Sequence, residues 1–311
     1  MPKPAAKPVR KPIAPVRSAS SQPEVVDPRW LLRMLGLLIV VALFCGYLTL
    51  GLLFYLGSWQ LALKPTHDPA RGSGLQSEKI SFGDGKQGKA PVSGEWLAAG
   101  AGASGNTVLY LRGADGQLDA GDGTQIGVLH DHGLNVLAFD YRGYGDNLPQ
   151  PHPTEERMLQ DAETAWNYLT QARRIAPNRL LVFGSGVGVS LAAQLLQEHK
   201  GGAALIGYNA DPEVAARVGR DPRSKLFPMG LVFHERFRLD ALRSLTLPKL
   251  LYSTGPLDTK RREVYRDAAD PKLTVEVPTH NAKEEQDALS RFLDLYLSQG
   301  TQAVPVLPIR P

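Results

Sequence analysis

A long uninterrupted apolar run stands out near the start of the chain. Residues 34–63 contain no charged side chain, and residues 35–56 are mostly Leu, Val, Ile, Phe and Gly. About 20 such residues span the hydrocarbon core of a bilayer. Trp30 and Trp59 flank the run, as aromatic side chains do at membrane interfaces. Because the run is apolar all round, without the polar stripe of a surface helix, we expect a transmembrane helix over residues 29–57.

The charges beside this run predict its orientation. Seven Lys or Arg residues precede it, whereas only Lys64 and Arg71 follow it closely. The positive-inside rule then puts the N-terminus in the cytoplasm and the larger C-terminal part outside it, in the periplasm if the source is a Gram-negative bacterium. The run is too long for a cleaved signal peptide and lacks a clear small-x-small cleavage site, so we expect it to stay in the membrane as a signal anchor.

The segments around the run differ in composition. Residues 1–28 are rich in Pro, Ala and Lys and have no apolar period, which is typical of a disordered tail. We expect residues 58–77 to be a linker, 78–300 to fold as one domain, and 301–311 to form a second tail.

Short apolar runs alternate with helical patterns beyond residue 78. The first two runs, 79–82 and 94–98, are expected to form an antiparallel pair of strands. Further strands are predicted at 107–111, 135–140, 180–183, 203–207, 249–253 and 273–277.

Apolar positions spaced three and four apart predict helices over 155–173, 187–198 and 282–297. Strands that alternate with helices indicate an α/β fold, with a mostly parallel sheet covered by helices on both faces. The pattern loosens between residues 209 and 246, where we expect a short cap over a pocket.

Composition narrows the classes of partner. The chain has 311 residues, 43% of them hydrophobic, which is enough for one large α/β domain. Residues 1–33 hold seven Lys or Arg and two acids, whereas the rest holds 28 and 29. The basic pI therefore comes from the N-terminal tail, and no nucleic-acid partner is expected. Cys45 is the single cysteine, so the chain forms no intrachain disulfide.

The residues around Gly186 predict a sharp turn between a strand and a helix. Gly184, Gly186 and Gly188 follow the apolar run 180–183 at alternate positions. This is the spacing of a Gly-x-Ser-x-Gly nucleophile elbow, in which the central serine sits on a strained turn. The outer glycines are present and the central serine is replaced by glycine. A simple tight turn, or a weak Gly-x-Gly phosphate loop, is the alternative.

Packing decides which residue stands at the nucleophile position. The positions two before and two after it must be small, because strand and helix backbones approach closely there. Gly184 and Gly188 meet this need around Gly186. Around Ser185 the same positions would be Phe183 and Val187, which are too large.

Five segments in order resemble the α/β-hydrolase superfamily, and within it the serine aminopeptidase-like branch of membrane-anchored hydrolase-domain proteins. They are Phe-Asp-Tyr-Arg-Gly-Tyr-Gly at 139–145, Val-Leu-Tyr-Leu-Arg-Gly at 108–113, the helix from Glu155 to Trp166, the strand and loop at 247–258, and Thr-His-Asn at 279–281. The similarity covers roughly residues 61–298.

The resemblance implies a role for each matching residue. His280 would be the general base, and Asp258 would hold its imidazole in the right tautomer. The backbone N–H groups of Ala114 and Val187 would form an oxyanion hole, and the nucleophile's place falls on Gly186. The order elbow, Asp, His is the one this fold uses.

Arg112 departs from the family pattern, which has histidine there. Its permanent charge either binds an anionic ligand in the pocket, beside Ser185, or pairs with Asp140 or Asp115, which we favour. Asp258 equally suits a turn or a helix cap, and a histidine before a helix is often only a polar contact at the helix start. We expect Ser190 to be a helix-packing residue.

No metal or cofactor is expected. His130-Asp131-His132 places two imidazoles near a helix end, but nothing implies the third distant ligand that a zinc site needs.

Three functions remain open on the sequence. The favoured one is a catalytically impaired or inactive hydrolase relative, a pseudoenzyme, that binds a small acyl or ester ligand or a partner at the lipid bilayer. The second is an active serine hydrolase on ester, thioester or amide substrates near the membrane. The third is a scaffold that docks an envelope protein.

Overall fold

The computed structural model describes residues 27–68, 72–83, 91–100, 105–148, 152–227, 230, 233–278 and 281–296. The chain divides into two compact units, Met1–Leu50 and Gly51–Pro311. The expected tails at 1–28 and 301–311 lie almost wholly outside the described residues.

The N-terminal apolar run forms one helix, α1 (Pro28–Gly57), of 30 residues. Its mean hydropathy reaches 2.6 over an 18-residue window, and 6% of that window is buried. Apolar side chains are thus exposed along its length, for example Leu43 at 69% and Leu38 at 66%. Helix α1 is long enough and apolar enough to span a bilayer.

The segment after α1 belongs to the second unit. A short helix, α2 (Trp59–Ala62), follows at once, and Ala62 and Leu63 are fully buried. Lys64 then pairs with the loop beyond strand β3 (Thr107–Leu111): its N–H donates to the Ala114 carbonyl at 3.0 Å, and its own carbonyl accepts from Gly116 N–H at 2.8 Å. The first part of the expected linker is therefore fixed against the folded domain.

In the part of the chain that the structure describes, eight strands form a single sheet in the order β1-β2-β4-β3-β5-β6-β7-β8. The first two strands are antiparallel to each other, β2 is antiparallel to β4, and the other pairs are parallel. The strands are β1 (Glu78–Phe82), β2 (Val92–Leu97), β3 (Thr107–Leu111), β4 (Asn135–Phe139), β5 (Leu180–Ser185), β6 (Ala204–Tyr208), β7 (Lys249–Thr254) and β8 (Lys272–Val277).

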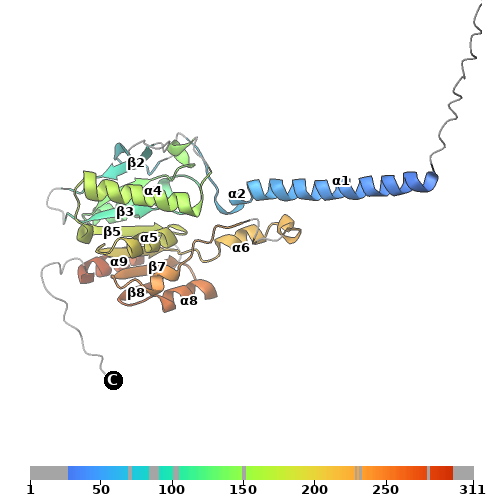
Figure 1. The fold of residues 1–311 in the computed structure, drawn as a ribbon. Helices are drawn as coiled ribbons and strands as arrows, with labels where there is room; N and C mark the ends of the chain where they lie inside the picture. Colours follow the sequence, from blue (N-terminus) through green and yellow to red (C-terminus); the bar gives the residue numbers. More distant parts are fainter. Residues whose placement is uncertain are drawn as a thin grey trace, which may run out of the picture. The chain divides into compact units, whose positions relative to one another are not determined.

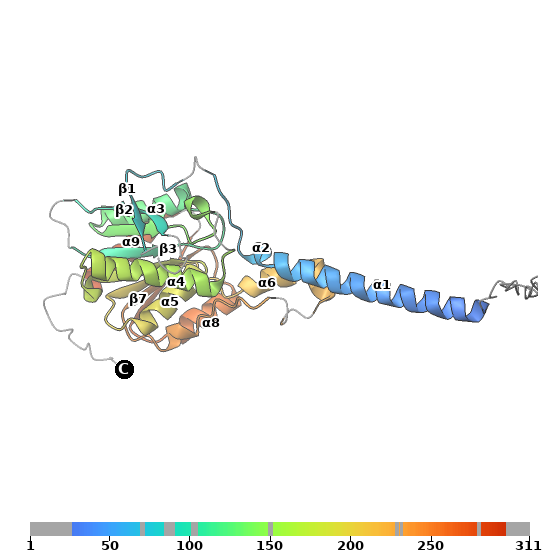
Figure 2. The same cartoon turned by 45° about the horizontal axis from the view of Figure 1, so that its top comes forward.

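Helices cover both faces of the sheet (Figures 1 and 2). One apolar cluster joins the sheet to α4 (Glu155–Asn167), which runs on into a π-helical turn at Tyr168–Ala172, and to α5 (Gly188–Glu198). A second cluster joins the opposite face to α3 (Ala120–Asp131) and α9 (Ala282–Tyr296). The expected α/β fold with a mostly parallel, doubly covered sheet is confirmed.

The helices α3 and α8 (Thr259–Asp267) were not expected, and neither was the short helix α2 in the expected linker. The α3 sequence contains three glycines and has no apolar stripe; its start is fixed by a capping box between Asp119 and Asp122. Helix α8 buries one side chain, Tyr265, and is otherwise strongly charged. In the sequence, α3 and α8 are marked by their N-terminal capping residues, Asp119 and Asp258, rather than by a hydrophobic period.

In the described part of the segment 209–246, where a cap was expected, the elements are short helical pieces. These are α6 (Val214–Gly219) and the 3-10 turns η5 (Pro222–Lys225) and η6 (Asp240–Arg243).

Candidate functional site

The chain turns sharply between β5 and α5. Gly186 lies in the turn with φ +55°, a left-handed conformation that side-chain-bearing residues rarely adopt. Its N–H donates to the carbonyl of Tyr208 at 3.0 Å, at the end of the neighbouring strand β6. The turn is therefore fixed at the carboxyl edge of the parallel sheet, where open α/β folds bind their ligands.

The three glycines differ in the space around them. A Cβ on Gly184 would lie 2.5 Å from the Gly188 carbonyl oxygen, and one on Gly188 would collide with the Leu111 carbonyl oxygen. Among the described residues, a Cβ on Gly186 would meet only the Gly113 Cα, at an ordinary 3.6 Å. The outer positions thus exclude any side chain, whereas the central one leaves room for a side chain beside the loop after β3.

Ser185 occupies the last position of β5 and also lines the cleft beside the turn. Its flanking side chains are bulky and buried: Phe183 stacks on Tyr110 with ring centroids 4.8 Å apart, and Val187 is 1% exposed. Ser185 therefore does not have the small neighbours of an elbow nucleophile. Ser190 is buried in α5 and donates to the Arg238 carbonyl at 2.6 Å, in a packing role.

A cleft of about 480 Å³ opens over the turn. Gly186, Val187, Gly113 and Ala114 contribute to its lining. Among the described residues, the N–H groups of Ala114 and Val187 have no hydrogen-bond acceptor. The cleft is therefore bordered by two backbone donors next to the open side of Gly186.

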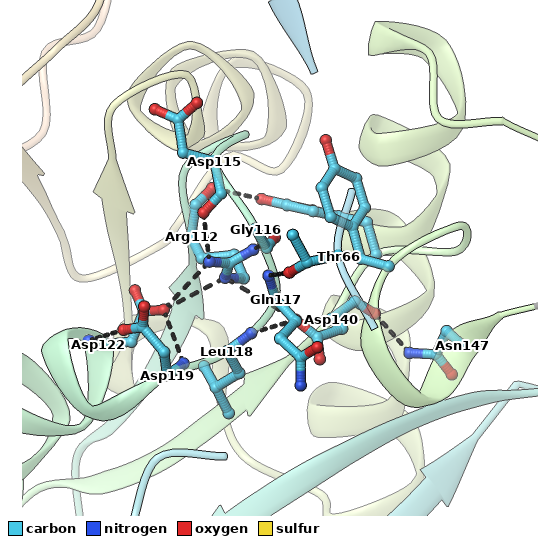
Figure 3. A network of polar contacts seen from close by, with 12 residues as sticks. Thr66, Arg112, Asp115, Gly116, Gln117, Leu118, Asp119, Asp122, Asp140 and Asn147 are labelled. Atoms are coloured by element: carbon cyan, nitrogen blue, oxygen red, sulfur yellow. Dashed lines mark hydrogen bonds and ion pairs between the residues drawn. The ribbon is translucent and has the colours of Figure 1, made fainter. Parts of the chain in front are cut away.

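Arg112 is buried at the edge of this cleft, and its guanidinium is held on several sides (Figure 3). It forms ion pairs with Asp122 at 3.3 Å and Asp140 at 3.8 Å, and it donates to the carbonyls of Asp115, at 3.1 Å, and Gly116. Asp140 was one of the partners considered from the sequence, whereas the contact with Asp115 is through its main chain. The charge is thus engaged in shaping the loop after β3.

Asp140 ties the same loop to the end of β4. Its carboxylate accepts from the Leu118 N–H at 2.6 Å (Figure 3). Burial raises the pKa of Asp140 to about 6, although the charge of Arg112 acts in the opposite direction. Tyr144 supports the loop from the other side, because its hydroxyl donates to the Ala114 carbonyl at 3.2 Å. These contacts fix the backbone that presents the Ala114 N–H.

Tyrosines close one side of the cleft. The Tyr110 hydroxyl donates to Asp122 at 2.8 Å, and burial raises its pKa well above the usual value. Tyr208 also lines the cleft, and its hydroxyl lies 3.3 Å from the Thr254 hydroxyl. Burial raises the pKa of Tyr208 as well, so both phenols remain neutral hydrogen-bonding groups near neutral pH.

Two further arginines line the cleft, and the sequence analysis did not single them out. Arg217 of α6 pairs with Asp115 at 3.2 Å and also with Asp211. Arg261 of α8 donates through Nε to the Ala210 carbonyl at 2.8 Å. Both come from segments with weak hydrophobic pattern, so only the tertiary structure brings them here. The cleft is consequently polar, with its arginine charges balanced by aspartates.

Asp258 is the N-cap residue of α8. Its carboxylate accepts from the Arg261 N–H at 2.7 Å and lies 3.6 Å from the Arg261 guanidinium. The side chain is 49% exposed. Asp258 therefore fills the capping role that was its alternative on the sequence. His280, the expected general base, lies outside the described residues.

His130 and His132 do not share a ligand site. The ring of His130 lies 3.1 Å from the Ala98 carbonyl, whereas the ring of His132 contacts the Val128 carbonyl at 2.7 Å and the Ser290 hydroxyl at 2.7 Å.

The eight-stranded sheet, its antiparallel start and the strand–turn–helix at Gly186 define the class of protein: this is an α/β-hydrolase fold. Comparison with solved structures agrees. An esterase from Pyrococcus furiosus, PF2001, superposes with a TM-score of 0.59 and covers 75% of this chain and 97% of its own, at 19% sequence identity. At that identity the likeness extends to the fold alone.

Sequence comparison finds a nearer relative. Uncharacterized protein Rv2307c of Mycobacterium tuberculosis is 30% identical over 226 residues, which cover 65% of this chain and 74% of the relative. Lysophosphatidylserine lipase ABHD12 of Danio rerio is 33% identical over 104 residues, 33% of this chain and 26% of its own length. No family model matches the chain. The chain belongs to the α/β-hydrolase superfamily, in one family with the mycobacterial protein.

Proposed function

We propose that this protein is a membrane-anchored pseudo-hydrolase that binds a ligand in the cleft above Gly186. The observation that carries the proposal is the contrast among three glycines. Gly184 and Gly188 have the tight packing that an elbow requires, while Gly186 has the elbow's left-handed backbone and free space but no nucleophilic atom.

The missing side chain removes the first chemical step. Without an oxygen or sulfur at position 186, no acyl-enzyme forms there. An oxyanion hole and binding alone retain about 10³–10⁴-fold over water. That corresponds to about 4–5.5 kcal/mol of the barrier, against the 8–23 kcal/mol typical of enzymes. Residual hydrolysis by a water molecule near Gly186 would therefore be slow.

The cleft keeps features that favour binding. The N–H groups of Ala114 and Val187 suit a carbonyl or carboxylate oxygen, and a ligand atom could occupy the space that Gly186 leaves open. A small acyl or ester compound has the right acceptor. The serine aminopeptidase-like branch of the superfamily is the affiliation we propose, since it joins this fold to a membrane anchor.

An active serine hydrolase is the second candidate. The similarity to a protein named as a lipase favours it. It requires Ser185 to act as nucleophile, or a serine to stand at 186 in the natural protein. The bulky neighbours Phe183 and Val187 argue against Ser185. A scaffold that docks an envelope protein is the third candidate function. No contact among the described residues of the cleft favours it.

Labelling with a fluorophosphonate probe tests the proposal. We expect no covalent adduct on the chain as it stands, and an adduct on Gly186→Ser, because a serine there would face the open cleft. Gly186→Ala is the matched control, since it adds a Cβ without the hydroxyl. Intact-mass and peptide mass spectrometry locate the modified residue.

Labelling of the unmodified chain at Ser185, abolished by Ser185→Ala, would overturn the proposal in favour of an active hydrolase. If neither the chain nor Gly186→Ser reacts, the nucleophile's absence is accompanied by loss of the rest of the catalytic apparatus. In that case binding of acyl compounds, measured by calorimetry on the unmodified chain, decides whether the cleft has a ligand.

A further inference from the structure

The cap segment packs against the last turns of α1. The Phe227 ring stacks on Phe54 with centroids 5.8 Å apart, and a Cβ added to Gly51 would lie 3.1 Å from the Phe227 ring. The Arg223 guanidinium lies 5.2 Å from the centre of the Phe54 ring. Residues 220–227, which we call the 220–227 surface, are thus held beside residues 51–54 of α1.

The side chains of this surface are basic and apolar together. Arg220, Arg223, Lys225 and Leu226 are exposed, Leu226 at 64%. Asp221 is the acid among them, and it pairs with Arg223 at 2.8 Å. Among the described residues, no ion pair involves Arg220 or Lys225. Lys225 therefore has no acidic partner among the described residues and lies next to an exposed leucine, whereas Arg220 lines a small hollow that it shares with Asp211, Glu213 and Asp258.

Helix length gives the depth of this surface in a membrane. The hydrocarbon core needs about 20 helical residues, and the charge-free run begins after Arg33. Counted from Met34, about 20 residues end near Leu53. The residues that touch Gly51 and Phe54 consequently lie at the boundary between the acyl chains and the lipid headgroups, if α1 spans the bilayer.

We propose that the 220–227 surface is a second membrane contact, whose occupant is the surface of an anionic bilayer. Leu226 enters the interface, while Arg220 and Lys225 extend their charged ends to lipid phosphates, as long basic side chains do at this depth. The inference rests on the anchoring part of the proposed function and is independent of whether Gly186 abolishes catalysis.

The contact bears on the cleft through α6. Arg217, which lines the cleft and pairs with Asp115, lies one turn before Arg220 in the chain. Lipid binding at 220–227 would hold α6 in the position in which Arg217 lines the cleft and pairs with Asp115.

Depth-dependent quenching in lipid nanodiscs tests the proposal on the full chain. Cys45→Ser removes the native thiol, and Leu226→Cys then carries an environment-sensitive NBD label. Leu295→Cys on α9 is the matched control, because Leu295 is another exposed leucine at 54%. In bilayers with anionic lipid we expect lipids that carry a shallow nitroxide quencher to lower the fluorescence at 226 several-fold more than at 295. Arg220→Gln with Lys225→Gln should reduce this difference, as should lipids without net charge.

The unmodified chain labelled at Cys45 reports on α1 separately. Quenching of Cys45 by a deep nitroxide, with no excess quenching at 226 over 295, would overturn the second contact while leaving the anchor intact. Absence of quenching at Cys45 would overturn both. The excess quenching at position 226 could persist in lipids without net charge, or in the chain that carries both Gln substitutions. Either result would contradict the role of the two basic residues.

Discussion

At the bend after β5, three nearby glycines meet three different needs. Gly184 lets the start of α5 approach the strand, and Gly188 lets α5 approach the end of β3. Gly186 instead adopts φ +55°, and among the described residues an added Cβ would meet only the Gly113 Cα, at 3.6 Å. The first two are required by packing between main chains, whereas the third is required only by conformation. Gly184 and Gly188 are therefore needed for the packing of the bend, whereas position 186 has space for a side chain.

Alanine substitutions at these positions should therefore differ in stability. Gly188→Ala places a methyl group on the Leu111 carbonyl and should destabilise the protein by about 3 kcal/mol or more, as forced backbone overlap does. Gly186→Ala should cost only about 1–2 kcal/mol, because it meets conformational strain without a clash. Urea unfolding of the detergent-solubilised full chain, followed by tryptophan fluorescence, measures both. Equal losses would show that our account of the bend is wrong.

At the scale of elements, capping residues define helices that lack a hydrophobic stripe. The sequence predicted the strands from their short apolar runs. It also predicted the amphipathic helices α4, α5 and α9, because their apolar period is strong. Helices α3 and α8 were missed because glycines or charges fill their faces. Asp258 illustrates the difficulty, because the same carboxylate is expected at a catalytic position and at a helix start.

Two substitutions at Asp258 separate these roles. Asp258→Ala should destabilise the chain by about 1 kcal/mol through loss of the cap on α8, whereas Asp258→Asn should keep that stability because asparagine caps equally well. In the Gly186→Ser background, Asp258→Asn should nevertheless abolish labelling by fluorophosphonate if Asp258 orients His280, because an amide favours the wrong imidazole tautomer. Unfolding curves and labelling rates are compared on the same samples. Full labelling of the Asn variant would leave Asp258 with the capping role alone.

At the scale of the whole molecule, charge is distributed unevenly along the sequence. The residues before the apolar run are strongly basic, whereas those after it are close to neutral in total. Because seven basic residues precede the apolar run, we expect the α/β-hydrolase domain outside the cytoplasm. Protease added to the outer face of spheroplasts that express the chain should digest the domain and spare the short N-terminal tail. A cytoplasmic marker protein that resists digestion is the control. Digestion of the domain only in inverted membrane vesicles would reverse the orientation.

The sequence by itself determined the apolar helix, the alternation of strands and helices, and the three alternating glycines at 184, 186 and 188. These follow from composition and local period, which act over a few residues. Only the tertiary structure decided that Arg112 is shared between Asp122 and Asp140, that Arg217 and Arg261 reach the cleft, and that residues 220–227 lie against the end of α1. Such contacts join residues far apart in the chain, and they depend on where strand ends and loops meet at one edge of the sheet.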